Sequence, residues 1–149
     1  MNKIKYWIPS LIIMIIIFLG SNDSGSGDKS RFLTHFILTI TGFFTSHKAT
    51  TEEIELIIFV LRKMAHIIEY FILAISYFYA LNNTYKKNSL KKTYTISFIL
   101  TFLYAITDEL HQSFVPNRVG TYHDVLIDSI GILSGYLLIY SIYKVKTNN

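Results

Sequence analysis

Long apolar stretches alternate with polar segments along the chain. Four apolar stretches stand out, at residues 6–20, 64–81, 93–107 and 125–143. A helix needs about 20 mainly apolar residues to cross a membrane, with about 17 as the lower limit. The second and fourth stretches meet this limit, whereas the first and third depend on Tyr and Trp residues at their ends, which favour the membrane interface. The pattern predicts an all-α integral membrane bundle with about four transmembrane helices.

The first stretch also has features of a secretory signal peptide. It follows two basic residues, Lys3 and Lys5, its apolar core is short, and small residues come after it. There is no clear A-x-A cleavage site, however, and cleavage would leave three spans, which fit the distribution of charge less well. We therefore expect the first stretch to remain as a membrane span.

The polar segment at residues 21–51 predicts two kinds of structure. Its first part, residues 21–30, is rich in Ser, Gly and Asp, which favours a turn or flexible connector. In residues 31–45 apolar side chains recur at the spacing of one helix face. They are Phe32, Leu33, Phe36, Ile37, Ile40, Phe43 and Phe44. We expect an amphipathic helix that either lies in the outer membrane interface or packs on the protein core.

The next helix has a clear start. Thr50 and Glu53 have the spacing of a capping box, and acidic residues here complement the helix dipole. A helix from Thr50 to about Leu81 would be roughly 45 Å long, which exceeds the hydrocarbon core of a membrane. Its first third should therefore protrude, tilt or pack against the amphipathic helix.

Composition narrows the class of protein. The chain has 149 residues, of which 51% are hydrophobic and 16% are charged, and it has no cysteine. Soluble domains carry about 25% charged residues, so an ordinary soluble enzyme is not expected. The absence of cysteine excludes disulfides, thiolate metal sites and thiol nucleophiles.

The distribution of charge predicts the orientation. If the chain crosses the membrane four times, one side holds both termini and the connector at residues 82–92, with eight basic residues and no acid. The other side holds all ten acids. The positive-inside rule then places both termini in the cytoplasm. The basic residues form no single patch, so no nucleic-acid partner is expected.

Ionisable residues enter three of the predicted spans near their outer ends. Such groups are costly in a membrane and normally face a cavity or a partner. We therefore expect these side chains to converge, although a salt-bridge network that serves only folding is the alternative. The set is Arg62, Lys63, His66, Glu69, Asp108, Glu109, His111, Arg118, Asp124 and Asp128, and it includes the neutral Gln112 beside them.

Two glycines support an inward position for the last of these residues. Gly131 and Gly135 follow Asp128 on the same helix stripe, and this spacing permits close helix packing. The same glycines are the one feature that points to a possible homodimer.

The polar set is compatible with three kinds of chemistry. Carboxylates and imidazoles can bind a divalent cation, but there is no H-E-x-x-H motif and the ligands fall on three helices, so we predict no metal and no other cofactor. A carboxylate beside a histidine can act in general acid–base catalysis, and basic side chains can hold a phosphate or carboxylate. The candidate catalytic residues are His66, Glu69, Asp108, Glu109 and His111. His35, His47 and His123 are expected at the surface, and Tyr70 and Tyr104 are expected to serve packing.

Three motifs resemble the VanZ-like family of small bacterial membrane proteins. They are Lys63-x-x-His66-x-x-Glu69-Tyr70, Asp108-Glu109-Leu110-His111-Gln112-x-Phe114-Val115-Pro116-x-Arg118 and Asp124-x-x-x-Asp128-x-x-Gly131-x-x-x-Gly135. Asn117, where the family often has Gly, and Ile67, where Phe is common, depart from the pattern. The resemblance implies one VanZ-like membrane domain over residues 1–149. The family is named for a protein that lowers susceptibility to teicoplanin, a lipid-bearing glycopeptide.

Two hypotheses of function follow. In the first, the outer polar cluster binds a membrane lipid or a lipid-linked cell-wall precursor. Its ligand-binding residues would be Lys63, His66, Glu69, Asp108, Glu109, Gln112, Arg118, Asp124 and Asp128. In the second, the chain is a small membrane enzyme that uses Asp108, Glu109 and His66 for acid–base or metal-assisted chemistry on a lipid head group. A transporter is disfavoured because the polar set lies on one side only and no inverted repeat is present.

Overall fold

The computed structural model describes residues 3–42, 50–86 and 89–148. These residues form one short 3-10 helix and five α-helices, and the described ranges contain no strand. The elements are η1 (Lys3–Tyr6), α1 (Ile8–Ser21), α2 (Ser26–Gly42), α3 (Thr51–Thr84), α4 (Leu90–Gln112) and α5 (Tyr122–Asn148). The all-α prediction is confirmed, and each predicted apolar stretch lies mainly in one of these helices.

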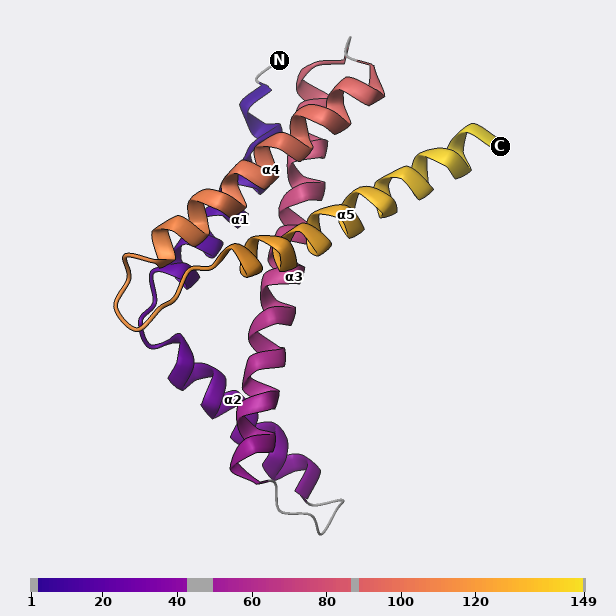
Figure 1. Ribbon diagram of the computed structural model, residues 1–149. Coiled ribbons are helices and arrows are strands. Elements are labelled where there is room, and N and C mark those ends of the chain that lie inside the picture. The colour runs from indigo at the N-terminus through magenta and orange to yellow at the C-terminus, as the bar shows by residue number, and fades with distance from the viewer. Residues whose placement is uncertain (1–2, 43–49, 87–88, 149) are drawn as a thin grey trace.

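The long helix α3 is the centre of the fold. The other four α-helices all pack against it. In Figure 1, α2 lies along the first half of α3, α1 and α4 run beside its second half, and α5 crosses it near the middle. The buried core is centred on the second half of α3 and includes Ile17, Tyr70, Leu73, Ala105 and Ile132.

Local chemistry accounts for the helix starts. Thr50 and Glu53 form both hydrogen bonds of the predicted capping box at the start of α3. Ser89 caps α4 by accepting a hydrogen bond from the backbone of Lys92. Pro9 lies in the first turn of α1, where its missing N–H has no intrahelical partner to lose.

The structure corrects the prediction for the connector after α1. Residues 26–30, predicted to be a turn or flexible, form the first turn of α2. Ser and Asp are poor residues in a helix interior but are favoured at a helix N-terminus. The apolar stripe of α2 is exposed at Phe32 and Phe36, while Thr34 is buried. The stripe is therefore open to the surroundings, and its last members, Phe43 and Phe44, lie outside the described residues.

The two glycines of α5 serve packing within the chain. A Cβ atom at Gly131 would lie 2.2 Å from the carbonyl oxygen of Ile67, and one at Gly135 would lie 2.9 Å from that of Phe71. Helix α5 thus rests directly on the backbone of α3, as the small-residue spacing predicts. Because these glycines contact the same chain, they no longer support a homodimer.

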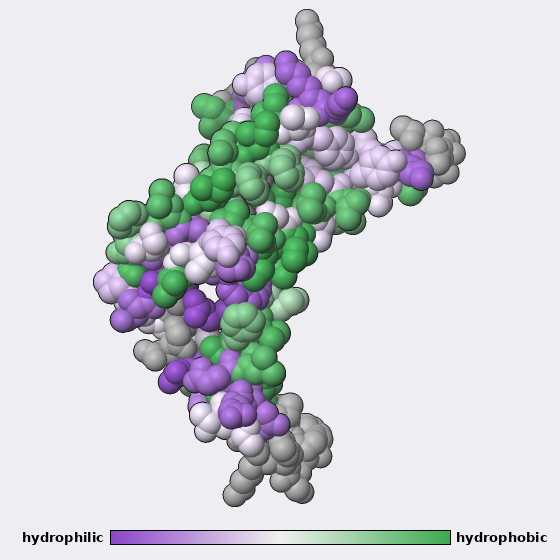
Figure 2. All heavy atoms as spheres, viewed as in Figure 1, coloured by the Kyte–Doolittle hydropathy of each residue, from purple (hydrophilic) through white to green (hydrophobic). Residues whose placement is uncertain are grey.

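The all-α part of the fold prediction is confirmed, but the four-span part is not. By length and composition, one helix of the described residues, Tyr122–Val145, is able to cross a membrane, and Ile8–Ser21 is a shorter apolar helix. The outward faces of the bundle are nevertheless apolar, with exposed residues such as Ile15, Leu103 and Leu133. Figure 2 shows this apolar surface over the middle of the bundle, between hydrophilic residues near the N-terminus and others around the α4–α5 connection.

Candidate functional site

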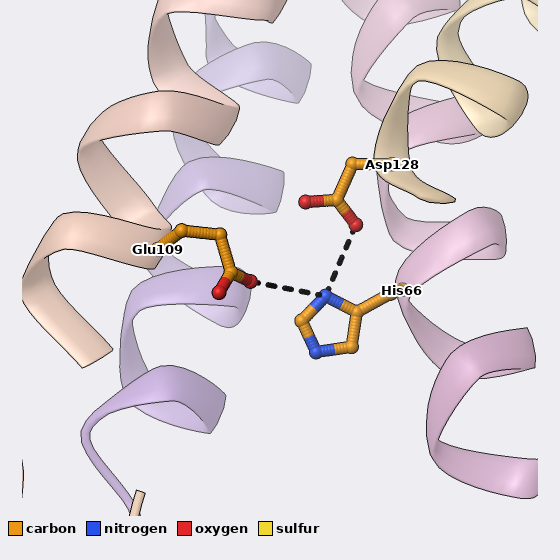
Figure 3. A group of neighbouring side chains, drawn as sticks. All are labelled: His66, Glu109 and Asp128. Carbon is orange, nitrogen blue, oxygen red and sulfur yellow. Dashed lines mark hydrogen bonds and ion pairs between the residues drawn. The ribbon is translucent and has the colours of Figure 1, made fainter. Parts of the chain in front are cut away.

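Three helices bring one histidine and two carboxylates together. Figure 3 shows His66 from α3, Glu109 from α4 and Asp128 from α5 pointing toward one another. The Nδ1 atom of His66 lies 3.1 Å from Oδ1 of Asp128 and 3.9 Å from Oε1 of Glu109. Both carboxylates are buried, and His66 is partly exposed. Three of the residues that we expected to converge are therefore neighbours in the structure.

Hydrogen bonds hold Glu109 in place. Its Oε2 atom accepts from the backbone N–H of Thr121, at 3.0 Å. The amide of Gln112 donates to Oε1 of Glu109, at 3.3 Å, and to Oδ2 of Asp108, at 3.0 Å. Gly120 lies so close that a Cβ there would be 1.9 Å from the carbonyl oxygen of Glu109. The α4–α5 connection is thus packed tightly against the end of α4.

Arg118 joins this connection to the end of α1. Its guanidinium donates to the carbonyl oxygens of Gly20 and Asp23, and to Oε1 of Gln112 at 3.5 Å. Burial of the guanidinium lowers the pKa of Arg118, and the positive charge of nearby Arg62 lowers it further. No residue-type signal points to Gly20 or Asp23, because each contributes a backbone carbonyl, which every residue type carries.

The turn before Arg118 explains one departure from the family motif. Asn117 has a φ of 61°, in the left-handed region. Glycine adopts this region freely, and asparagine is among the few other residues that tolerate it. Asn117 can therefore take the place that the family often gives to Gly without changing the turn.

Two further predicted residues are paired with each other. Lys63 of α3 and Asp124 of α5 form a partly buried ion pair. Their charges offset each other, so this pair joins the two helices and is less available to a ligand than the triad is.

The other predicted histidine lies away from the triad. The ring of His111 stacks on that of Phe18, with 5.0 Å between ring centroids, so it faces α1. His35 and His123 are exposed, as expected for surface residues, whereas His47 lies outside the described residues. Tyr70 is fully buried, and the hydroxyl of Tyr104 donates to the carbonyl oxygen of Met14 at 2.7 Å, so both pack within the bundle.

A cleft of about 250 Å³ lies beside the triad, between α1, α2 and α3. Its charged lining combines Arg62, His66 and Glu69, which share one face of α3, with Arg118 from the α4–α5 connection. Ser21 and Leu33 bring α1 and α2 to the same cleft. The i, i+4, i+7 spacing of the three α3 residues thus produces one shared lining, as the sequence predicts.

Comparison with known proteins identifies the family. The sequence model described as VanZ/LLP1 matches residues 6–144, well beyond the motif region at residues 62–135. No curated protein and no solved structure matches the chain. The match suggests a membrane protein, in agreement with the apolar helix Tyr122–Val145. Because the match covers nearly the whole sequence, this chain belongs to the VanZ/LLP1 family.

Proposed function

We propose that this protein is a multi-pass membrane protein that binds the anionic head group of a cell-envelope lipid or lipid-linked precursor at the outer membrane surface. The observation that carries the proposal is the cleft lined by Arg62, His66, Glu69 and Arg118. It combines two permanent cations with groups that can accept or donate hydrogen bonds.

The arrangement of the chain ends supports a four-span topology. Figure 1 shows the N-terminus, the α3–α4 connection and the C-terminus toward one end of the bundle, away from the α4–α5 connection. The N-terminus, the α3–α4 connection and the C-terminus carry the excess of lysine, which favours the cytoplasmic side. In this topology the membrane is crossed by α1, the second half of α3, α4 and α5. Their exposed apolar side chains would then contact lipid, and the cleft would open toward the outer leaflet.

The two arginines favour an anionic ligand. Burial is the main cause of the lowered pKa of Arg118, and the positive charge of Arg62 lowers it further, so the two guanidinium groups repel each other. The carboxylates of Asp23, Asp108 and Glu109 act in the opposite direction. Arg118 is held by backbone carbonyls, but Arg62 has no hydrogen bond or ion pair within the described part of the chain. A phosphate between them would offset this repulsion, and guanidinium groups match phosphate oxygens with paired hydrogen bonds.

The surroundings of the cleft suit a lipid. Leu33 lines it, and the neighbouring Phe32 and Phe36 of α2 are exposed. An amphipathic helix in the interface would place these side chains among acyl chains while the cleft holds the head group. A role in lowering susceptibility to teicoplanin, for which the VanZ-like family is named, would follow if the bound lipid or precursor alters the cell surface that the drug meets.

A titration tests the head-group proposal. The purified full-length protein would be titrated with a short-chain phosphatidylglycerol, and with a short-chain phosphatidylcholine for comparison. Arg62→Gln should weaken binding of the anionic lipid about tenfold or more, since it removes a charge-assisted contact. Arg31→Gln is the matched control, because Arg31 is exposed, pairs with Glu55 and is not one of the residues that line the cleft. Equal binding of the anionic lipid by both variants and the wild type would contradict the proposal.

The hydrogen bond between His66 and Asp128 supports a second candidate function, that of a small membrane enzyme. A histidine positioned by a carboxylate is suited to proton transfer, and His66 also lines the cleft. A membrane enzyme acting on a lipid head group should then release product from the bound lipid. Glu109→Gln keeps the shape of the side chain and removes its charge. Product release at the wild-type rate by this variant would argue against a catalytic role for Glu109.

A further inference from the structure

We propose that His66, Glu109 and Asp128 form a binding site for one divalent transition-metal ion, of which Zn²⁺ is the best match. This site goes beyond head-group binding and does not depend on it. From the sequence we predict no metal, because there is no H-E-x-x-H motif and the ligands fall on three helices. The structure brings the three ligands from three separate helices.

The spacing of the donor atoms fits one shared ion. One donor atom from each residue can be chosen so that all three lie within 4.8 Å of one another. The two separations from His66 Nδ1 are 3.1 Å and 3.9 Å. Ligands that bind a metal at about 2.1 Å are about 3.0 Å apart in octahedral and about 3.4 Å apart in tetrahedral coordination. Shifts of less than about 1 Å would therefore bring the three atoms onto one ion.

A buried carboxylate oxygen gives an independent indication of a ligand. Asp128 is 0% exposed, and its Oδ2 atom has no hydrogen-bond donor among the described residues. Figure 3 shows this second oxygen pointing toward the side of α4, where Glu109 lies. Buried polar atoms are nearly always satisfied, and an unsatisfied one calls for an ion, a water molecule or a function. A metal ion held by Glu109 and by both oxygens of Asp128 would satisfy it.

The charges around the triad also favour a cation. Asp108, Glu109 and Asp128 are all buried. Within the described residues, His66 is the one basic side chain within ion-pair distance of Glu109 or Asp128. Lys63 is committed to Asp124, and Gln112 brings a neutral amide. A divalent cation would offset negative charge that is otherwise expensive to bury.

The hydrogen bonds behind the ligands would orient them. Glu109 is held by Thr121 and Gln112, which leaves lone pairs on its carboxylate for a metal. Such outer contacts commonly fix ligand geometry and raise metal affinity. One imidazole with two carboxylates suits Zn²⁺ better than Mg²⁺, which prefers oxygen ligands and retained water. Three protein ligands also leave a coordination position open, as in catalytic zinc sites.

Metal titration of the full-length protein, without added lipid, tests this site. After treatment with a chelator, the protein would be titrated with Zn²⁺, and the bound metal would be measured by elemental mass spectrometry. We expect about one ion per chain, and binding weakened at least about tenfold in Asp128→Asn and Glu109→Gln. Glu55→Gln is the matched control, because Glu55 is exposed, pairs with Arg31 and lies about three turns before His66 in α3.

A spectroscopic measurement on the wild type tests the site even if the variants fail to fold. Co²⁺ bound to the wild type should show d–d absorption bands that saturate at one equivalent, and Zn²⁺ should displace them. Absence of these bands and of stoichiometric Zn²⁺ would overturn the proposal, as would unchanged affinity in a folded Asp128→Asn variant. Arg62→Gln should still bind Zn²⁺. Loss of head-group binding in that variant is therefore distinguishable from loss of metal.

Discussion

Gly131 offers a sharp test of how the candidate site is held together. It lies on the face of α5 that rests on α3, one turn after Asp128. A Cβ added there would lie 2.2 Å from the carbonyl oxygen of Ile67, whereas ordinary contact begins at 3.4 Å. In Gly131→Ala the two helices must therefore separate by roughly 1 Å. The 3.1 Å hydrogen bond between His66 and Asp128 spans the same interface and should lengthen.

Two opposing effects set the magnitude. Alanine favours a helix over glycine by about 1 kcal/mol, while overpacking an interface costs about 1–3 kcal/mol. At 2.2 Å the contact is with backbone, which has little freedom to move, so overpacking should exceed the gain in propensity. The difference is a net loss of up to about 2 kcal/mol, which would lower the melting temperature of a chain of this length by up to about 8 °C.

The assay is thermal unfolding of the purified protein in detergent. Gly20→Ala is the control, since a Cβ at Gly20 meets nothing within 4 Å. It should be neutral or slightly stabilising, because only helix propensity changes. Gly135→Ala, whose nearest contact would be 2.9 Å, should fall between the two. If Gly131→Ala melts at or above the temperature of Gly20→Ala, the close packing of α5 on α3 described above is wrong.

Two further substitutions probe contacts that join distant parts of the chain. Arg118→Lys should lower the free energy of unfolding by about 1–3 kcal/mol, because lysine has one nitrogen where the guanidinium reaches the carbonyl oxygens of both Gly20 and Asp23. If thermal unfolding shows no larger loss for Arg118→Lys than for the exposed control Arg31→Lys, this reasoning is wrong. Trp7→Phe removes the 3.0 Å hydrogen bond from the indole to Thr84 and should lower the free energy of unfolding by about 1 kcal/mol. If Thr84→Val added to Trp7→Phe causes a second loss of the same size, the two side chains are not paired.

Much of the fold follows from periodicity and capping. The four apolar stretches each lie mainly in a helix, and the Thr50 capping box forms as predicted. The start of α2 was not predictable from composition, because Ser, Gly and Asp favour both turns and helix N-termini. The side of α2 that packs was not predictable either, since an apolar stripe can face lipid or protein. The burial of Thr34 indicates that a different face meets α3.

The side chains of α3 that line the cleft were predictable as a set, but the pairings between helices were not. Arg62, His66 and Glu69 had to share a face because helix geometry fixes their spacing. Which residues meet across helices depends on helix rotation and crossing angle, which the sequence does not state. The sequence therefore did not distinguish His66 from His111, although His111 stacks on Phe18 in the structure. The backbone partners of Arg118 were beyond any residue-type signal.

The most direct test of the central proposal is native mass spectrometry of the protein extracted from its own membrane. Wild type, Arg62→Gln and the control Arg31→Gln would be compared for lipid that stays bound. We expect an anionic, phosphate-bearing lipid on the wild type and on Arg31→Gln, with strongly reduced occupancy on Arg62→Gln. Equal occupancy on all three, or retention of zwitterionic lipid alone, would contradict the assignment of the cleft as a head-group site.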